Sequence, residues 1–229
     1  MELNDLFRKQ GIDPATVLVL RHRPSEPQLR KVLPWLAAEK PALFNAYQQT
    51  QGEKVEKSML RATHVASFIG HEPGKALFVG LYAITDATPL THDEFWRVPE
   101  NQALHALGMQ GFTDADERAT IQWFALEHAD FYEEWCGKLI VDWPGLERSW
   151  WRQAHNNTIR IHAILEDSAL DPALKDWKDL VFTWEELGVL PKRLQHALAQ
   201  WRGIYYIHDT TDEKGYVGAA YGDENILGR

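Results

Sequence analysis

The chain has 229 residues, of which 45% are hydrophobic and 25% charged, the balance of a folded globular protein rather than a disordered one. Its 33 acidic and 24 basic side chains give a net charge of −9, which excludes a basic field over the whole surface but not a local basic patch. The single cysteine, Cys136, excludes an internal disulfide framework and a cysteine-based zinc site. No apolar run approaches the ~20 residues that span a bilayer, and the polar N-terminus lacks a signal peptide, so a cytoplasmic protein without membrane contact is expected.

Short helices and one strand are predicted for the first sixty residues. The apolar run at 17–20 indicates a strand, and apolar residues at helical spacing predict helices over 2–10, around 29–36 and around 43–47. Pro34 is expected to weaken the second helix or end it early. The segment 52–60, in which lysines alternate with glutamates, is expected to be a solvated loop or helix face.

A hairpin is predicted next, because the β-rich runs 63–69 and 76–84 flank the turn residues 70–74. Residues 85–111 are expected to be irregular, with one short helix around Asp93. The segment 114–128 is interpreted as an amphipathic helix, with Thr113 as its N-cap and acidic residues in its first turn.

The remaining pattern predicts strands over 138–143 and 159–165, a helix start at 182–187 and a helix over 191–201. Early helices followed by scattered strands favour an α+β fold, in which a small β-barrel-like sheet is flanked by helices. We expect this domain to cover residues 1–200 and a second segment to cover 201–229.

The C-terminal segment contains the most specific motif. Gly-Ile-Tyr-Tyr-Ile-His at 203–208 and Tyr-Val-Gly-Ala-Ala-Tyr-Gly at 216–222 are separated by a polar turn, which predicts a hairpin. Tyr205 and Tyr216 are eleven residues apart and are expected to converge across that hairpin. Residues 223–229 are expected to begin a helix.

This arrangement resembles the GIY-YIG endonuclease superfamily. The resemblance extends beyond the two triplets, because an arginine follows at the expected start of a helix. It implies that Tyr205, Tyr216 and Arg229 surround a scissile phosphate. The motif glycines Gly203 and Gly218 would let the backbone approach its neighbours closely.

Phosphodiester hydrolysis uses those residue types. A tyrosine can relay a proton, and an arginine is a bidentate clamp for phosphate oxygens. The resemblance also implies one Mg²⁺ or Mn²⁺ ion on a carboxylate located well downstream of the arginine, followed by an asparagine. The chain ends at Arg229, so only the first part of a GIY-YIG domain is covered. We therefore expect the front of a longer nuclease, inactive alone, with no metal ligand and no bound metal.

A small nuclease domain is expected to take its specificity from an attached reader. Aromatic side chains beside arginine and asparagine suit stacking on a base and reading its edge. Between 138 and 164, the DNA-binding candidates are Trp143, Arg148, Trp150, Trp151, Arg152 and Asn156. The alternative is that the tryptophans are core residues and the arginines are surface charges. If Trp150 and Trp151 lie in a strand, their rings point to opposite faces.

A second candidate surface is a basic patch for phosphate. Its members are Arg21, His22, Arg23, Lys31, Lys54, Lys57 and Arg61. The alternative is an ordinary solvated exterior. The paired histidines His64 and His71, and His155 and His162, have no recognised zinc spacing.

Residues 137–164 also resemble, faintly, the PUA-like domains fused upstream of restriction-type nucleases. We therefore expect a restriction or defence endonuclease whose residues 1–200 recognise duplex DNA, with a modified or flipped base as a candidate target. Two alternatives stay open. The front domain is a protein-interaction or regulatory module that does not bind DNA, or it is a PUA-like RNA-binding module.

Overall fold

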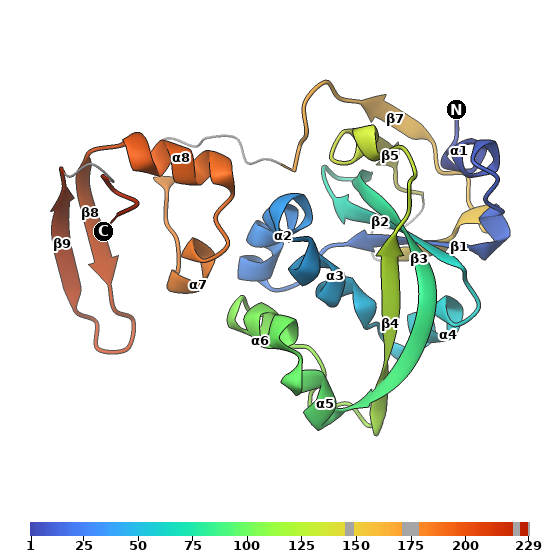
Figure 1. Cartoon of the computed structure of the whole chain (residues 1–229), viewed down its shortest axis with the longest axis horizontal. Coiled ribbons are helices and arrows are strands. Elements are labelled where there is room, and N and C mark those ends of the chain that lie inside the picture. The colour runs from blue at the N-terminus through green and yellow to red at the C-terminus, as the bar shows by residue number, and fades with distance from the viewer. Residues whose placement is uncertain (145–148, 171–178, 222–224, 229) are drawn as a thin grey trace. The chain divides into compact units, whose positions relative to one another are not determined.

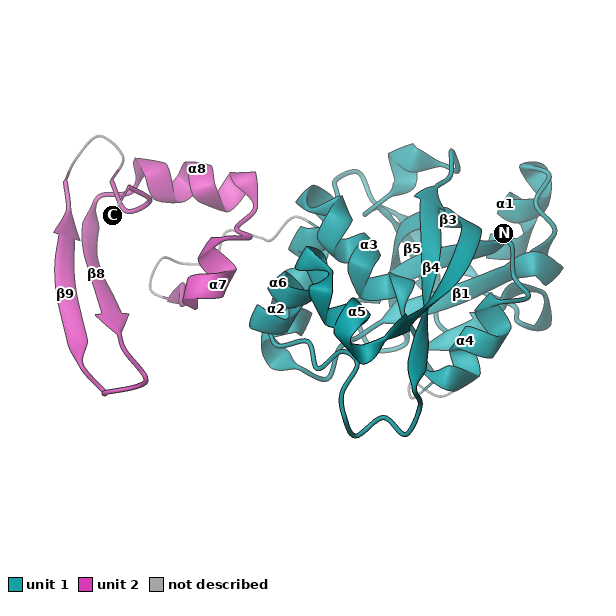
Figure 2. Ribbon diagram, turned by 60° about the horizontal axis from the view of Figure 1, so that its bottom comes forward, with its two compact units in different colours: residues 1–170 teal, residues 171–229 magenta. Residues whose placement is uncertain are grey.

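A computed structural model of the chain describes residues 1–144, 149–170, 179–221 and 225–228 (Figure 1). The chain divides into two compact units, residues 1–170 and residues 171–229 (Figure 2). The division falls thirty residues before the boundary expected at residue 200, so the helices that precede the C-terminal hairpin belong with the hairpin. Among the described residues, no helix is both long and apolar enough to cross a membrane.

The first unit is α+β and is built on a curled, half-barrel mixed sheet (Figure 1). Its strand order is β6-β1-β2-β3-β5-β7, and β4 also pairs with β3. The pair β1 and β2 is parallel, whereas the other pairs among the described residues of this sheet are antiparallel. The strands are β1 (Val17–His22), β2 (His64–Gly70), β3 (Lys75–Thr91), β4 (Thr120–His128), β5 (Leu139–Asp142), β6 (Trp151–Gln153) and β7 (Ile161–Ile164).

The curl of the sheet follows from its longest strand. The predicted hairpin is confirmed by β2 and β3, but β3 continues to Thr91 through residues that were expected to be irregular. On the edge away from β2, residues 75–77 of β3 pair with β5 and residues 82–91 pair with β4. The β3–β4 register shifts between Ile84 and Asp86, and such a bulge adds twist to a strand.

Four predicted helices are confirmed: α1 (Leu3–Lys9), α2 (Pro27–Glu39), α3 (Pro41–Gln49) and α5 (His92–Arg97). The segment 52–60, expected as a solvated loop or a helix face, contains α4 (Glu53–Met59), and α6 (Pro99–Ala106) is an additional helix that the sequence analysis did not predict. Pro34 does not end the helix early, because α2 continues past it to Glu39. The buried face of α2, which includes Leu29, Leu33 and Leu36, compensates for the backbone hydrogen bond that proline cannot make.

Apolar side chains are buried on both faces of the sheet, which explains why all six residues of β1 are buried. One face forms a cluster with α1 and the segment around Phe131, and Trp143 belongs to this cluster. On the other face lie Leu18, Leu20 and His22. His22 contacts Phe44 of α3 edge-on, with ring centroids 5.6 Å apart.

The helix predicted over 114–128 is absent, and this segment contains β4 instead. The capping interaction expected at Thr113 is present, because its backbone N–H and hydroxyl both donate to Asp116 Oδ2, at 2.8 and 3.1 Å, but no helix follows it. Residues 114–119 form turns and irregular structure instead of a helix. Ile121, Phe124 and Leu126 are buried because β4 lies along the curled part of β3, a long-range pairing that overrides the local helical spacing.

The second unit contains α7 (Trp184–Leu187), α8 (Lys192–Gln200) and the hairpin β8 (Gly203–His208) and β9 (Gly215–Ala220), all as predicted. A capping box between Thr183 and Glu186 begins α7. Leu194 and Leu198 are the buried residues of α8. The expected helix start at 223–229 is not seen where the chain is described, because residues 225–228 form a turn.

Candidate nucleic-acid interface

The tryptophan pair at 150–151 lies beside the edge strand β6, which pairs with β1 and places Trp151 opposite Leu20. Trp150 immediately precedes β6, and its carbonyl accepts a 2.7 Å hydrogen bond from the backbone N–H of Arg21. Successive side chains of a strand point to opposite faces, and the side chains of Trp150 and Trp151 accordingly lie on different surfaces. Trp151 lines one cavity and Trp150 lines another. Both side chains are half-buried, so neither is a fully buried core residue.

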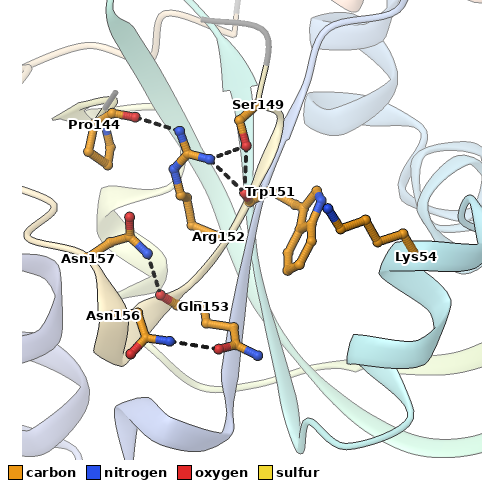
Figure 3. Close-up of a pocket in the computed structure, with 8 residues that line it drawn as sticks. All are labelled: Lys54, Pro144, Ser149, Trp151, Arg152, Gln153, Asn156 and Asn157. Carbon is orange, nitrogen blue, oxygen red and sulfur yellow. Dashed lines mark hydrogen bonds between the residues drawn. The ribbon is translucent and has the colours of Figure 1, made fainter. Parts of the chain in front are cut away.

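The cavity at Trp151, which we name the Trp151 groove, has a volume of about 510 Å³ (Figure 3). Its lining comes from α4, the segment before β6, β6 itself and the turn that follows. The lining residues are Lys54, Pro144, Ser149, Trp151, Arg152, Gln153, Asn156 and Asn157. All of them are half-buried or exposed, so the groove is a surface feature without a buried floor.

A cation lies against the aromatic ring of the groove. Lys54 reaches from α4 toward Trp151, and its Nζ lies 5.9 Å from the ring centroid (Figure 3). Both residues were candidates from the sequence, but as members of different patches. Their contact places a positive charge beside a half-exposed indole, which suits a phosphate and an adjacent stacked base.

Arg152 holds the polypeptide around the groove together. One terminal nitrogen donates to the Ser149 hydroxyl and to the Trp151 carbonyl at 3.2 Å, and the other donates to the Pro144 carbonyl at 2.8 Å (Figure 3). The guanidinium also lies 5.7 Å from the Trp143 ring centroid. Arg152, which the sequence analysis gave as a DNA-binding candidate or a surface charge, is therefore a positioning residue that joins Pro144 to the tryptophan pair.

Two amides complete the groove. Asn156 Nδ2 donates to the Gln153 side-chain oxygen, and Asn157 Nδ2 donates to the Gln153 carbonyl, both at 2.8 Å. Asn156 and Gln153 are exposed. Their amide groups offer both donors and acceptors at the surface, which is the capacity needed to contact a base edge or a sugar.

The second cavity, which we name the β1 cleft, opens at the carboxyl end of β1 and has a volume of about 490 Å³. Its lining combines three arginines, two carboxylates and two aromatic side chains with a buried histidine. The lining residues are Arg21, His22, Arg23, Pro24, Ser25, Glu26, Tyr47, Thr50, Gln51, Gly52, Met109, Gly111, Asp116, Arg118, Ile121 and Trp150. Unlike the groove, this cleft has buried side chains in its wall, among them Gln51, Met109 and Ile121.

The charged groups of the β1 cleft are fixed by the protein. Arg118 forms a 3.0 Å ion pair with Glu56 and donates to the Gln51 carbonyl at 3.3 Å. Glu26 accepts a 3.0 Å hydrogen bond from the Ser25 hydroxyl. Burial, and secondarily the charge of Glu26, raises the pKa of Tyr47, so its hydroxyl stays protonated at neutral pH.

His22 is the most unusual group of the cleft. It is only 4% exposed, and its Nε2 has no hydrogen-bond partner among the described residues. Burial lowers the pKa of the ring to about 4, although a hydrogen bond with Gln48 partly opposes this shift. The imidazole is therefore neutral at pH 7 and carries one N–H and one lone pair.

Several predicted DNA-binding residues do not lie at an accessible surface. Trp143 is 4% exposed, belongs to the core cluster and donates from Nε1 to the Ser149 carbonyl at 2.8 Å, so it is a core residue. Arg21 is 2% exposed, and its guanidinium lies 4.9 Å from the Trp143 ring centroid. Arg23 is exposed and lines the β1 cleft. Arg148 lies outside the described residues.

The basic patch predicted from the sequence is not one surface. Arg21 and His22 are buried, and Lys57 forms a 2.6 Å ion pair with Glu53. Lys31 Nζ lies 5.9 Å from the ring centroid of Trp35. Lys54 alone among these lysines lines a described cavity.

The two motif tyrosines converge on one face of the C-terminal hairpin. In the β8–β9 register Tyr205 is opposite Gly218 and Tyr216 is opposite Ile207, so the tyrosines are diagonal neighbours, with ring centroids 6.2 Å apart. Tyr205 is half-buried, whereas Tyr216 is 60% exposed.

Gly218 makes the approach of Tyr205 possible. A Cβ added to Gly218 would lie 2.8 Å from Cε2 of Tyr205 and still closer to its hydroxyl end. Gly203, the other motif glycine, is not sterically crowded, because a Cβ added there meets nothing within 4 Å. Arg229, the expected phosphate clamp, lies outside the described residues.

The described residues do not provide a metal site for this hairpin. They contain no group of three histidine, cysteine, aspartate or glutamate side chains that is arranged to hold an ion. Two carboxylates of the connecting turn, Asp209 and Asp212, accept hydrogen bonds from Thr211 and Lys214, respectively. The divalent ion implied by the sequence resemblance is therefore not assigned to any of the described residues, and no chemical step is derived through it.

Sequence reasoning missed most of the β1 cleft. Tyr47 lies in the last turn of α3, and Gln51 follows this helix. Arg118 lies in the segment 114–128, which was wrongly predicted to be a helix. The available signal was Arg21-His22-Arg23-Pro24 at the end of a strand, because polar residues that leave a buried strand often line a site. The partners of these residues are fixed only by tertiary packing.

Comparison with models of protein families, with curated proteins and with solved structures finds no match to this chain.

Proposed function

We propose that residues 1–170 recognise duplex DNA and that the C-terminal hairpin is the first part of a GIY-YIG endonuclease domain. The observation that carries the nuclease half is the arrangement of the hairpin. Two motif tyrosines share one face with their rings 6.2 Å apart, and the motif glycine Gly218 lies directly under one of them.

Tyr205 and Tyr216 are the groups of this hairpin that would touch the phosphate region. A tyrosine hydroxyl can donate a hydrogen bond to a phosphate oxygen or pass a proton to or from water. Arg229 is the proposed clamp for the charge that develops on phosphorus. The complete nuclease would supply Mg²⁺ or Mn²⁺ on a carboxylate outside this hairpin, and the chain of 229 residues is expected to bind DNA without cutting it.

The recognition half is supported by the Trp151 groove. It brings together a half-exposed indole, the ammonium of Lys54 and exposed amides, which together suit the backbone and base edges of a nucleic acid. The curled sheet is compatible with the PUA-like fold proposed from the sequence. The net charge of −9 means that this contact must be a local patch on an acidic molecule.

The decisive test is a binding titration of the full chain against duplex DNA at two salt concentrations. We expect binding that weakens steeply as salt rises, because counterions are released when phosphates are neutralised. Trp151→Ala should weaken binding at least fivefold. Trp184→Ala is the matched control, because Trp184 is 83% exposed in α7 and outside both cavities, and it should leave affinity unchanged.

Other outcomes would redirect the function. No binding to any duplex at low salt would overturn the DNA-recognition role and favour a protein-interaction or regulatory module. Preferential competition by structured RNA would favour an RNA-binding module. Equal loss of affinity in Trp151→Ala and Trp184→Ala would remove the groove from the interface.

A further inference from the structure

The longest stretch of this chain without an acidic side chain is 187–208, which contains three basic side chains. The next longest, 148–165, contains Trp151 and most of the lining of the Trp151 groove. In a protein with a net charge of −9, such stretches are where a polyanion meets the least repulsion. The stretch 187–208 includes α8 and β8, the strand that carries Tyr205, and α8 belongs to neither of the basic surfaces expected from the sequence.

Helix α8 has one buried and one exposed face. Leu194 and Leu198 are buried, whereas Arg193, His196 and Gln200 are exposed, and their spacing of three and four residues places these three on one side of the helix. We name these three residues the α8 stripe. In the described part of the chain, their side chains form no hydrogen bond or ion pair. Because a helix rises 1.5 Å per residue, the stripe extends about 10 Å along α8.

Arg202 adds a positive charge between α8 and the motif hairpin. It is exposed and lies between the end of α8 and the start of β8. The same end of α8 is held by the segment that follows the hairpin. Asn225 Nδ2 donates to the Ala199 carbonyl at 2.7 Å, and the Ile226 N–H donates to the Trp201 carbonyl at 3.2 Å. A polymer bound along α8 is therefore held by the same compact unit that carries the motif tyrosines (Figure 2).

The exposed groups of α8 suit a phosphate backbone better than a lipid surface. An arginine binds phosphate oxygens through paired donors, and histidine and glutamine side chains can donate hydrogen bonds to phosphate or sugar oxygens. A helix that lies on a membrane inserts an apolar face into it. The leucines of α8, Leu194 and Leu198, are buried in the protein and cannot supply such a face.

We propose that the α8 stripe and Arg202 bind the phosphate backbone of DNA, as a second contact that the nuclease unit makes independently of the Trp151 groove. This inference rests on the proposed function and adds the means by which the hairpin unit holds its substrate. Phosphate contacts fix the position of a duplex but carry no sequence information directly. The α8 contact therefore places the backbone at the motif tyrosines without choosing the site.

The test is the salt dependence of DNA binding. The full chain and the double variant Arg193→Ala/Arg202→Ala are titrated with duplex DNA over a series of salt concentrations. Each phosphate contact contributes about 0.9 to the slope of log affinity against log salt, so the double variant should lose about 2 from this slope. Its affinity should fall about tenfold, and by the same factor for two duplexes of unrelated sequence.

Two further double variants and one direct measurement locate the contact. Lys9→Ala/Lys214→Ala removes the same formal charge at exposed positions outside both cavities, and it should leave the slope almost unchanged. Arg193→Lys/Arg202→Lys keeps both charges and should retain most of the slope, because a lysine still binds phosphate as a point charge. Amide hydrogen exchange over 191–202 should slow when DNA binds to the native chain.

The failure of this inference differs from the failure of the proposed function. An unchanged slope in Arg193→Ala/Arg202→Ala, with affinity still lost in Trp151→Ala, would overturn the α8 contact and leave DNA recognition by the groove standing. An equal loss of slope in Lys9→Ala/Lys214→Ala would show that DNA responds to net charge alone. Unchanged exchange over 191–202 would place the contact elsewhere and overturn it. Absence of binding to any duplex at low salt would overturn both proposals.

Discussion

The ring of Tyr205 lies directly over the backbone of Gly218, its partner across the β8–β9 hairpin, so closely that a Cβ at Gly218 would sit 2.8 Å from Cε2 of the tyrosine. This contact positions Tyr205 beside Tyr216 on the same face. The sequence motif Tyr-Val-Gly thus has a structural meaning in this chain. Its glycine is required by a side chain on the opposite strand and not by the backbone conformation.

Replacing Gly218 by alanine is therefore expected to displace Tyr205 and loosen the hairpin, at a cost of about 1–3 kcal/mol in hairpin stability, the range for overpacking. Gly203→Ala is the matched control, because an added Cβ there meets nothing within 4 Å. Amide hydrogen exchange over 203–220 measures the effect. Faster exchange in Gly218→Ala than in Gly203→Ala is the expected result, and equal exchange would contradict the role given to the contact.

Alanine substitutions of Trp143 and Trp151 are expected to have different effects, the first mainly on stability and the second mainly on DNA affinity. Trp143 is 4% exposed and lies beside the guanidinium groups of Arg21 and Arg152, so Trp143→Ala should cost about 3–5 kcal/mol of unfolding free energy. Trp151 is half-buried at the sheet edge, and its replacement should cost less stability but more DNA affinity. Urea denaturation and the DNA titration measure the two effects. A larger stability loss for Trp151→Ala than for Trp143→Ala would reverse the assignment.

Sequence reasoning predicted elements that depend on local signals. The hairpin β2–β3 follows from turn residues between β-rich runs, and α8 follows from its single apolar face. It failed where distant pairing decides the outcome. Ile121 and Phe124 have helical spacing, but they lie in β4 because the extended β3 offers them a partner strand. The same long-range pairing hid the extension of β3 to Thr91.

The candidate site was predicted only in part, because its composition also depends on long-range packing. The residue pattern between 138 and 164 identified Trp150, Trp151 and Asn156 as chemically suitable, and the structure places each of them in the lining of a cavity. The sequence alone could not distinguish these tryptophans from Trp143, because the burial of a tryptophan ring is decided by tertiary packing. Nor could it show that Arg152 donates to carbonyls of the segment around it.

His22 is expected to make the first unit less stable in acid. Its pKa is lowered by burial to about 4 in the folded chain, against 6.5 in the unfolded chain, so between these values the unfolded state binds the proton more readily. Unfolding free energy should therefore fall as pH drops from 6.5 to 4, by about 3 kcal/mol from this residue. The adjoining Tyr47 stays protonated throughout this range, because its pKa is raised.

Comparing the chain with His22→Gln isolates this effect, because other titrating groups contribute equally to both proteins. Urea denaturation followed by tryptophan fluorescence at pH 7 and pH 4 gives the two differences. The native chain should lose about 3 kcal/mol more than His22→Gln over this interval. An equal loss in both proteins would show that the imidazole becomes protonated without penalty, contrary to its burial.

Lys54 and Lys57 lie on the same short helix and differ in what they contact. Lys54 Nζ is 5.9 Å from the Trp151 ring centroid and lines the groove, whereas Lys57 is paired with Glu53 at 2.6 Å and lines neither cavity. If the groove binds a DNA backbone, Lys54→Ala should lower affinity several-fold and reduce the slope of log affinity against log salt by about 1. Lys57→Ala removes the same formal charge one helical turn away and should leave both quantities almost unchanged. Equal effects of the two substitutions would mean that DNA responds to the charge of the helix as a whole and that Trp151 and Lys54 do not form a specific contact.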